Sequence, residues 1–132
     1  MFKIKPAHQD GSRRKDFGQL LPAEKKLRAA VARGDECEIS EKRPEGPTDN
    51  NRIRPGFLRF LALSGDEKTP VHARGIRLTG AWIGDSDEKE KDSDLDLDSC
   101  TVKVPLALHL CHVPGTVKLE DARLQSVTLD GS

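Results

Sequence analysis

In the stretch VKLEDARLQSVTLDGS, residues 117–132, apolar residues recur at regular intervals. Apolar side chains stand two apart at Val117 and Leu119, and the pattern restarts after five residues at Ala122. It restarts once more at Val127. A single amphipathic strand alternates with period two and does not restart every five residues. We therefore interpret this stretch as three units of a five-residue repeat.

The same unit recurs upstream, from residue 76 onward. Nine pentads read IRLTG, AWIGD, LDLDS, CTVKV, LALHL, CHVPG, VKLED, ARLQS and VTLDG. Position one alternates between large and small residues, and position three is always aliphatic. If four pentads complete one turn, pentads one, five and nine stack, as do two and six, and four and eight. The pattern therefore predicts parallel strands that wind into a short solenoid.

This small-x-aliphatic-x-x pattern resembles that of pentapeptide-repeat proteins, which form right-handed quadrilateral β-helices. Residues 53–83, IRPGFLRFLALSGDEKTPVHARGIRLTGAWI, also resemble the N-terminal part of a longer bacterial family without an established activity. The resemblance implies a mainly β fold: a right-handed parallel quadrilateral β-helix of about two coils with an N-terminal α-helical cap. It carries over no cofactor and no catalytic residue.

The chain before the repeats divides into an arm and a cap. The arm is polar and basic, and we expect it to be flexible. The cap has a first helix that starts at Pro22 and stops at Gly34, and a second helix that ends at Gly65. These helices are expected to plug the open end of the solenoid. The predicted organisation is an arm over 1–19, a helical cap over 20–74 and a β-helix over 75–132 with an acidic insert over 86–94.

The acidic insert interrupts the repeat between AWIGD and LDLDS. Residues 85–98 contain eight carboxylates and two lysines and are too polar to pack. Asp94, Asp96 and Asp98 alternate with inward leucines, so we expect them to point outward from one strand. A calcium loop is disfavoured, because leucine and lysine occupy its glycine and glutamate positions. Two hypotheses remain: an acidic surface that occupies a phosphate-binding groove, and a solvated loop that blocks edge pairing.

The expected partner surface combines this insert with an outward tryptophan. Such a tryptophan is either an interface anchor or is covered by the N-terminal helices. The resemblance adds a mode of action, because some pentapeptide-repeat proteins inhibit DNA-handling enzymes by mimicking duplex DNA. We therefore expect a protein partner, with a nucleic-acid-binding protein as the sharper hypothesis. The residues predicted to bind it are Trp82, Asp85, Asp87, Glu88, Asp92, Asp94, Asp96 and Asp98.

The other reactive residue types form no predicted site. His109, Cys111 and His112 lie close in sequence, but the repeat places Cys111 inward and the histidines outward on different walls. A zinc site needs convergent ligands. Cys37 has no adjacent base, and the chain has no dinucleotide-binding glycine motif. We therefore predict no metal, no cofactor, no catalytic residue and no enzymatic activity.

Composition and charge limit the class of protein. The chain has 132 residues, 35% of them hydrophobic, which suits one domain. Residues 1–84 carry 17 Lys and Arg against 11 Asp and Glu, and residues 85–132 carry 5 against 11. Such asymmetry is typical of a binding surface or of a solvated one. Three cysteines form no disulfide framework, and neither a signal-peptide core nor a membrane-spanning run is present, so we expect a cytoplasmic protein.

These observations favour a non-enzymatic protein-interaction module that presents an acidic surface on a rigid β-helix, as an inhibitor that mimics nucleic acid. One alternative is the N-terminal fragment of a longer β-helix scaffold. A second alternative, from another class, is an enzyme or cofactor binder, for which the sequence offers no convergent polar groups. Because the last repeat is expected to expose its apolar cross-section, a homodimer joined through this C-terminal end is a further hypothesis.

Overall fold

The computed structural model describes residues 17–67, 69–84, 94–124 and 126–131. The described part is β-rich, with small and mostly parallel sheets and with two helices, α2 (Pro22–Arg33) and α3 (Pro55–Ala62). The strands are β1 (Cys37–Glu38), β2 (Arg52–Ile53), β3 (Gly65–Asp66), β4 (Thr69–Pro70), β5 (Ile76–Thr79), β6 (Trp82–Ile83), β7 (Leu95–Asp96), β8 (Thr101–Val102), β9 (Leu106–His109), β10 (Val117–Lys118), β11 (Arg123–Leu124) and β12 (Val127–Thr128).

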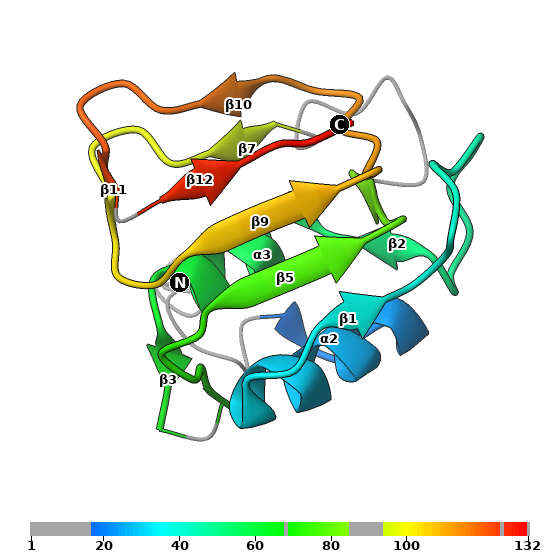
Figure 1. Ribbon diagram of the computed structural model, residues 1–132, viewed down its shortest axis with the longest axis horizontal. Coiled ribbons are helices and arrows are strands. Elements are labelled where there is room, and N and C mark those ends of the chain that lie inside the picture. Colours follow the sequence, from blue (N-terminus) through cyan, green and yellow to red (C-terminus); the bar gives the residue numbers. More distant parts are fainter. Residues whose placement is uncertain (1–16, 68, 85–93, 125, 132) are drawn as a thin grey trace, which may run out of the picture.

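Parallel ladders organise the described residues. One four-stranded sheet has the order β1–β5–β9–β12 and extends from the side of α2 to the far end of the molecule (Figure 1). Further parallel pairs join β2 to β6, β7 to β10 and β8 to β11, whereas β3 and β4 pair antiparallel. An isolated parallel bridge between Trp82 and His112 extends the β2–β6 pair by one step. Four parallel ladders result.

The pairing register is the one that the five-residue repeat predicts. Ile76 lies opposite Leu106, and Leu106 lies opposite Val127, so pentads one, five and nine stack. The bridge beyond β6 brings pentads two and six together, and the β8–β11 pair does the same for pentads four and eight. The predicted parallel pairing and its register are therefore confirmed.

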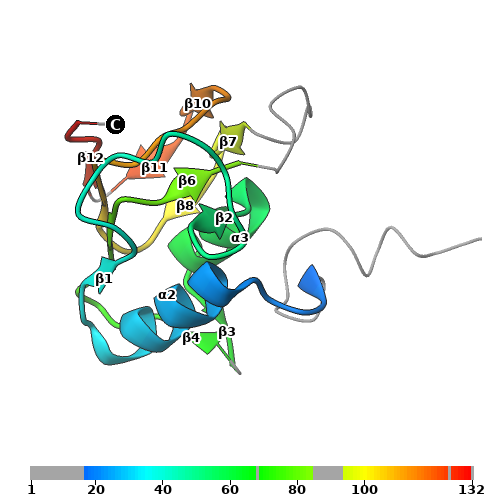
Figure 2. The same ribbon diagram turned by 90° about the vertical axis from the view of Figure 1, so that its right-hand side faces the viewer.

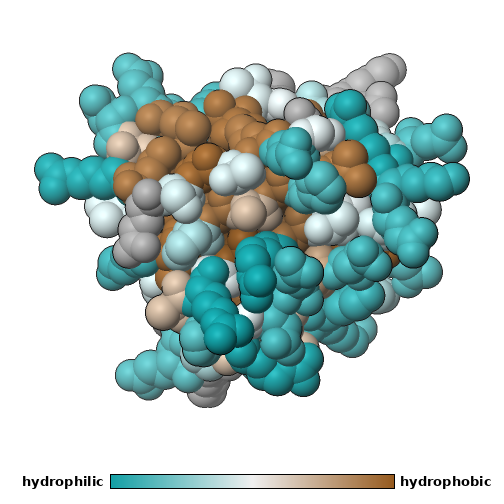
Figure 3. Space-filling view, in the orientation of Figure 1, coloured by the Kyte–Doolittle hydropathy of each residue, from teal (hydrophilic) through white to brown (hydrophobic). Residues whose placement is uncertain are grey.

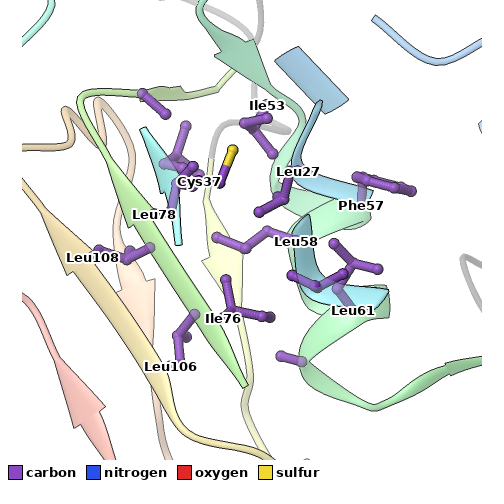
Figure 4. Packing of buried hydrophobic residues seen from close by; sticks show 14 of the residues in the cluster. Leu27, Cys37, Ile53, Phe57, Leu58, Leu61, Ile76, Leu78, Leu106 and Leu108 are labelled. Carbon is purple, nitrogen blue, oxygen red and sulfur yellow. The ribbon is translucent and has the colours of Figure 1, made fainter. Parts of the chain in front are cut away.

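The core forms because positions one and three of the pentads point inward. Burial alternates along β5 and β9, so Ile76, Leu78, Leu106 and Leu108 are buried and the residues between them are partly or fully exposed. Figure 4 shows these side chains directed toward the helices, where Leu27 meets them. The strands and the helices thus share one hydrophobic cluster.

Helix α2 has the start and stop signals that the sequence predicts. Pro22 is its first residue, where a backbone N–H is not needed, and Gly34 ends it with a φ of 79°. Its apolar residues recur at helical spacing and form the stripe that faces the sheet. The buried apolar residues of this stripe are Ala23, Leu27, Ala30 and Val31.

Helix α3 brings large apolar side chains against β7. The rings of Phe57 and Phe60 each lie 5.4 Å from the ring of Phe17, which belongs to the end of the predicted arm. Residues 1–16 of that arm lie outside the described residues. The helix ends earlier than the predicted stop at Gly65, because Ser64 has a φ of 79° and cannot continue a right-handed helix.

The region predicted as a helical cap, residues 20–74, also contains strands. β1 pairs with β5, and β2 pairs with β6, so two ladders begin one strand earlier than the repeat indicates. Each of these strands has only two residues, which is too short to show a period of two. The purely helical cap is therefore corrected to one of mixed helices and strands.

A buried ion pair joins the beginnings of the two helices. The side chain of Glu24 is fully buried, and its Oε1 lies 2.8 Å from Nη2 of Arg54. Its Oε2 accepts the backbone N–H and the Nε–H of Arg54, both at 2.9 Å. Oε1 also accepts the N–H of Leu21 at 2.9 Å, so one carboxylate satisfies donors at both helix starts.

Candidate functional site

The predicted acidic strand points outward, as its alternation indicates. Leu95 and Leu97 are buried, whereas Asp96 is exposed and Asp94 and Asp98 are half-buried. The other acidic residues predicted to bind a partner lie outside the described residues: Asp85, Asp87, Glu88 and Asp92. The structure therefore places three of the seven predicted carboxylates, and it places them together on and beside β7.

These three carboxylates accept hydrogen bonds from backbone N–H groups. Oδ1 of Asp94 accepts the N–H of Thr116 at 2.7 Å, and Oδ1 of Asp98 accepts the N–H of Glu120 at 2.7 Å. Both bonds cross from the β7 segment to the β10 segment. Oδ1 of Asp96, on β7, accepts the N–H of Asp98 at 3.0 Å, in the turn that follows the strand. The outward acids thus help to fix the neighbouring strand, a role that the sequence analysis did not predict.

The electrostatics of Asp94 agree with this role. Its pKa lies below the ordinary value of 3.8, mainly because its carboxylate accepts the N–H of Thr116, and Lys118, 3.4 Å away, adds to the effect. A carboxyl group whose pKa is lowered on folding stabilises the fold above its unfolded pKa and loses that contribution as the pH falls through its folded pKa. Acidification is therefore expected to weaken the link between β7 and β10.

Replacing Asp98 by alanine is expected to lower the free energy of unfolding by about 1 kcal/mol, because the N–H of Glu120 loses its acceptor. Asparagine keeps an oxygen acceptor, so Asp98→Asn is expected to cost less than half of that. Urea denaturation of both variants measures the difference. Equal losses in the two variants would show that charge, and not the hydrogen bond, matters at this position.

The hypothesis that Trp82 is an exposed interface anchor is wrong. Its side chain is 1% exposed, although its pentad position points outward. The indole stacks on the ring of His112, with 4.3 Å between centroids, and Nη2 of Arg43 lies 3.1 Å from Nδ1 of His112. Figure 2 shows the segment between β1 and β2 crossing β6, and the backbone N–H of Trp82 donates to the carbonyl of Asn51 in that segment. The segment between β1 and β2, and not a helix, therefore covers Trp82.

The C-terminal strands expose apolar side chains that their neighbours bury. We call β10, β11 and β12 the end strands. Val127 lies opposite Leu106, yet Val127 is partly exposed and Leu106 is buried. Leu124 and Leu129 are exposed by 39% and 37% and are the large hydrophobic residues that stand out as exposed in the described chain. We call the following set the end face: Val117, Leu119, Ala122, Leu124, Val127 and Leu129.

Apolar residues also gather at the surface on the side of the molecule where the end strands lie. Figure 3 shows apolar residues gathered over the upper part of the molecule, where Figure 1 places β9 and β12. Within the described residues, each end strand pairs on one side only, with β7, β8 or β9. Unpaired strand edges beside apolar side chains are the ordinary starting point for association.

The histidines and cysteines do not converge. Cys111 is buried, His109 lies 3.0 Å from Oδ2 of Asp130, and His112 stacks on Trp82. In the described residues, no three His, Cys, Asp or Glu side chains gather as a metal site would require. A shallow hollow beside α2 offers no carboxylate, thiol, hydroxyl or imidazole side chain. Its lining residues are Lys25, Arg28, Ala29, Ala32 and Pro70.

The three cysteines differ in reactivity. Burial raises the pKa of the Cys37 thiol from 9.0 to about 11, against the opposing effect of Lys26, and burial also raises the pKa of Cys111. Cys100 is half-buried, with its Sγ 3.6 Å from Nη2 of Arg59. Burial therefore disfavours the thiolate form of Cys37 in the folded chain.

A thiol reagent at about pH 8 is expected to label Cys100 first in the native protein, and to label Cys37 and Cys111 only after unfolding, because the latter two are buried and protonated. Mass spectrometry of the labelled peptides identifies the order. Rapid native labelling of Cys37 would contradict the burial of β1.

Comparison with protein-family models, with curated proteins and with solved structures finds no match to this chain. The resemblance to pentapeptide-repeat proteins therefore rests on the repeat alone. None of the helices in the described residues is long and apolar enough to cross a bilayer.

Proposed function

We propose that this chain is a non-enzymatic protein-interaction module in which a rigid stack of parallel strands receives another polypeptide at its end face. One observation carries the proposal: in the described chain, the large apolar side chains at inward repeat positions that are more than a third exposed are Leu124, on β11, and Leu129, directly after β12. Their counterparts one step earlier, Val102 and Leu108, are 1% and 0% exposed. A polypeptide that covers the end face removes this apolar surface from water.

We also propose that the four ladders are the walls of a right-handed quadrilateral β-helix. The walls recur in one order, since β5, β6, β7 and β8 are followed by β9, the His112 bridge, β10 and β11. The chain between Ile76 and its partner Leu106 contains the acidic insert, whereas the shorter chain between Leu95 and its partner Val117 does not. Right-handedness follows the strong general preference of parallel crossovers.

Replacing Leu124 or Leu129 by lysine is expected to change the free energy of unfolding by less than about 0.5 kcal/mol, because each side chain is already exposed. The same variants are expected to lose most of the binding of an apolar fluorescent probe such as anilinonaphthalene sulfonate. Denaturation in urea and probe titration make the two measurements.

The matched control is Thr128→Lys, an exposed outward position on β12 that lies opposite the uncharged Ala107. It adds the same charge and is expected to leave probe binding unchanged. If Leu124→Lys destabilises the chain as much as a core substitution does, the exposed leucines are structural and the proposal fails.

The acidic inhibitor is retained as a second proposal, because Asp94, Asp96 and Asp98 alternate on one outward face, about 7 Å apart along the strand. Asp96→Asn together with Asp98→Asn removes two charges and keeps oxygen acceptors for the backbone. We expect the wild-type chain to displace duplex DNA from a lysine-rich peptide at low salt, and the double variant to do so less well. Equal displacement by both proteins would exclude these acids as a mimic of phosphates.

A further inference from the structure

We infer that the polypeptide that covers the end face is a second copy of this chain, joined about a twofold axis through β10 and β12. The inference rests on the proposed function, since it names the partner of the same surface. It is carried by the direction of two end strands and by the order of charges along them.

The two strands run in opposite directions (Figure 1), and they lie on different sides of the upper end of the molecule (Figure 2). A twofold axis can lie in the plane of the end face and pass through the middle of β10. The same axis then passes through β12. Each strand then meets its own copy antiparallel. This is an isologous contact, in which the same surface serves both partners and the assembly closes at two copies.

The segment of β10 is complementary to itself in that arrangement. Lys118 and Glu120 are exposed and flank the inward Leu119. Antiparallel pairing centred on Leu119 places Lys118 of each copy against Glu120 of the other. Cross-strand pairs of opposite charge stabilise a sheet, and directly opposed like charges destabilise it. A parallel arrangement in the same register would oppose like charges instead.

The segment of β12 fits the same axis. Thr128 and Asp130 are exposed and flank the inward Leu129. Antiparallel pairing centred on Leu129 places the Thr128 hydroxyl, a donor, against the Asp130 carboxylate of the other copy. The central residues of both contacts, Leu119 and Leu129, occupy position three of their pentads. One axis therefore serves both strands.

The overall charge of the end strands also permits self-association. The stretch 117–131 contains two basic residues, Lys118 and Arg123, and three acidic ones, Glu120, Asp121 and Asp130. Each copy thus brings a formal charge of −1 to the contact, which is a weak repulsion in salt. The acidic stretch before β7, by contrast, would repel its own copy, so it does not compete as a self-contact.

Charge-swap variants test the twofold arrangement directly. Light scattering over a concentration series is expected to show a reversible dimer for the wild type. Lys118→Glu alone or Glu120→Lys alone opposes like charges twice per dimer, which is expected to weaken dimerisation by about tenfold or more. An equimolar mixture of these two variants restores both opposite pairs between the copies and is expected to recover the dimer. The pair of Lys118 with Asp94 inside one copy stays lost in Lys118→Glu, so urea denaturation of each variant is measured as the control for folding. The double variant Lys118→Glu/Glu120→Lys is expected to dimerise with itself.

The outcomes separate the inference from the function on which it rests. If the wild type is a monomer at every concentration, or if the mixture dimerises no better than the single variants, the second copy is not the partner. If the apolar probe still binds the monomer through Leu124 and Leu129, the end face remains an interaction surface for another chain. If the probe does not bind, both the partner and the proposed function are wrong. A dimer that Leu124→Lys leaves intact would place the contact elsewhere.

Discussion

Replacing Glu24 by glutamine is expected to lower the free energy of unfolding by about 3–5 kcal/mol, the usual loss when one partner of a buried ion pair is removed. The carboxylate is fully buried and accepts four hydrogen bonds, from Leu21 and from three donors of Arg54. The amide of glutamine brings two donors to a place where every neighbour already donates. The guanidinium of Arg54 also keeps its charge without a counterion.

Urea denaturation followed by circular dichroism measures this loss. The matched control is Glu36→Gln, because Glu36 is also paired with an arginine, Arg77, but at 3.7 Å and with 74% of its side chain exposed. Exposed pairs contribute about 0–1 kcal/mol, so the control is expected to be nearly silent. A loss below about 1 kcal/mol for Glu24→Gln would show that the two helix starts do not depend on this pair.

Replacing Gly75 by alanine is expected to lower the free energy of unfolding by about 2–5 kcal/mol, as the sum of two effects. Gly75 has a φ of 81°, which an L side chain rarely adopts. A methyl group there would also collide with the carbonyl oxygen of Pro105, the atom that accepts the N–H of Ile76 at 2.9 Å. Relief of the collision therefore requires β5 and the segment before β9 to separate.

Two other glycines separate these effects. Gly18 has a φ of 62° and open space around it, so Gly18→Ala measures the backbone strain alone, about 1–2 kcal/mol. Gly46 has neither feature, and Gly46→Ala is expected to be neutral. The expected order of destabilisation is Gly75, then Gly18, then Gly46. If Gly75→Ala costs no more than Gly18→Ala, the ladder is not as tightly packed at this step as the described geometry requires.

The repeat predicts the parallel ladders because five-residue periodicity constrains inward positions over many residues at once. Stacking Ile76 on Leu106 and on Val127 follows from the periodicity alone. The strands β1 and β2 escape prediction, because two residues carry no period. Their place in the ladders is set by tertiary packing against β5 and β6.

Side-chain roles were harder to predict than strand register. Trp82 is at an outward position, and it is covered by the residue 40–51 loop and by the ring of His112, neither of which its own pentad predicts. The pairing of Glu24 with Arg54 joins residues 30 positions apart, for which the sequence has no local signal. The acids of β7 were predicted to point outward, but their bonds to the N–H groups of Thr116 and Glu120 depend on the neighbouring strand.

Ladder partners are separated by different lengths of chain, as the pairs Ile76 with Leu106 and Leu95 with Val117 show. β6 ends at Ile83 and β7 begins at Leu95, yet the later strands keep their register: β9 pairs with β5, and β10 pairs with β7. The register is therefore determined by the inward aliphatic residues and not by the number of residues between β6 and β7. We expect the connection between β6 and β7 to accept a change in length while the parallel ladders keep their alignment. A foreign peptide grafted between these two strands is accordingly expected to leave the register unchanged.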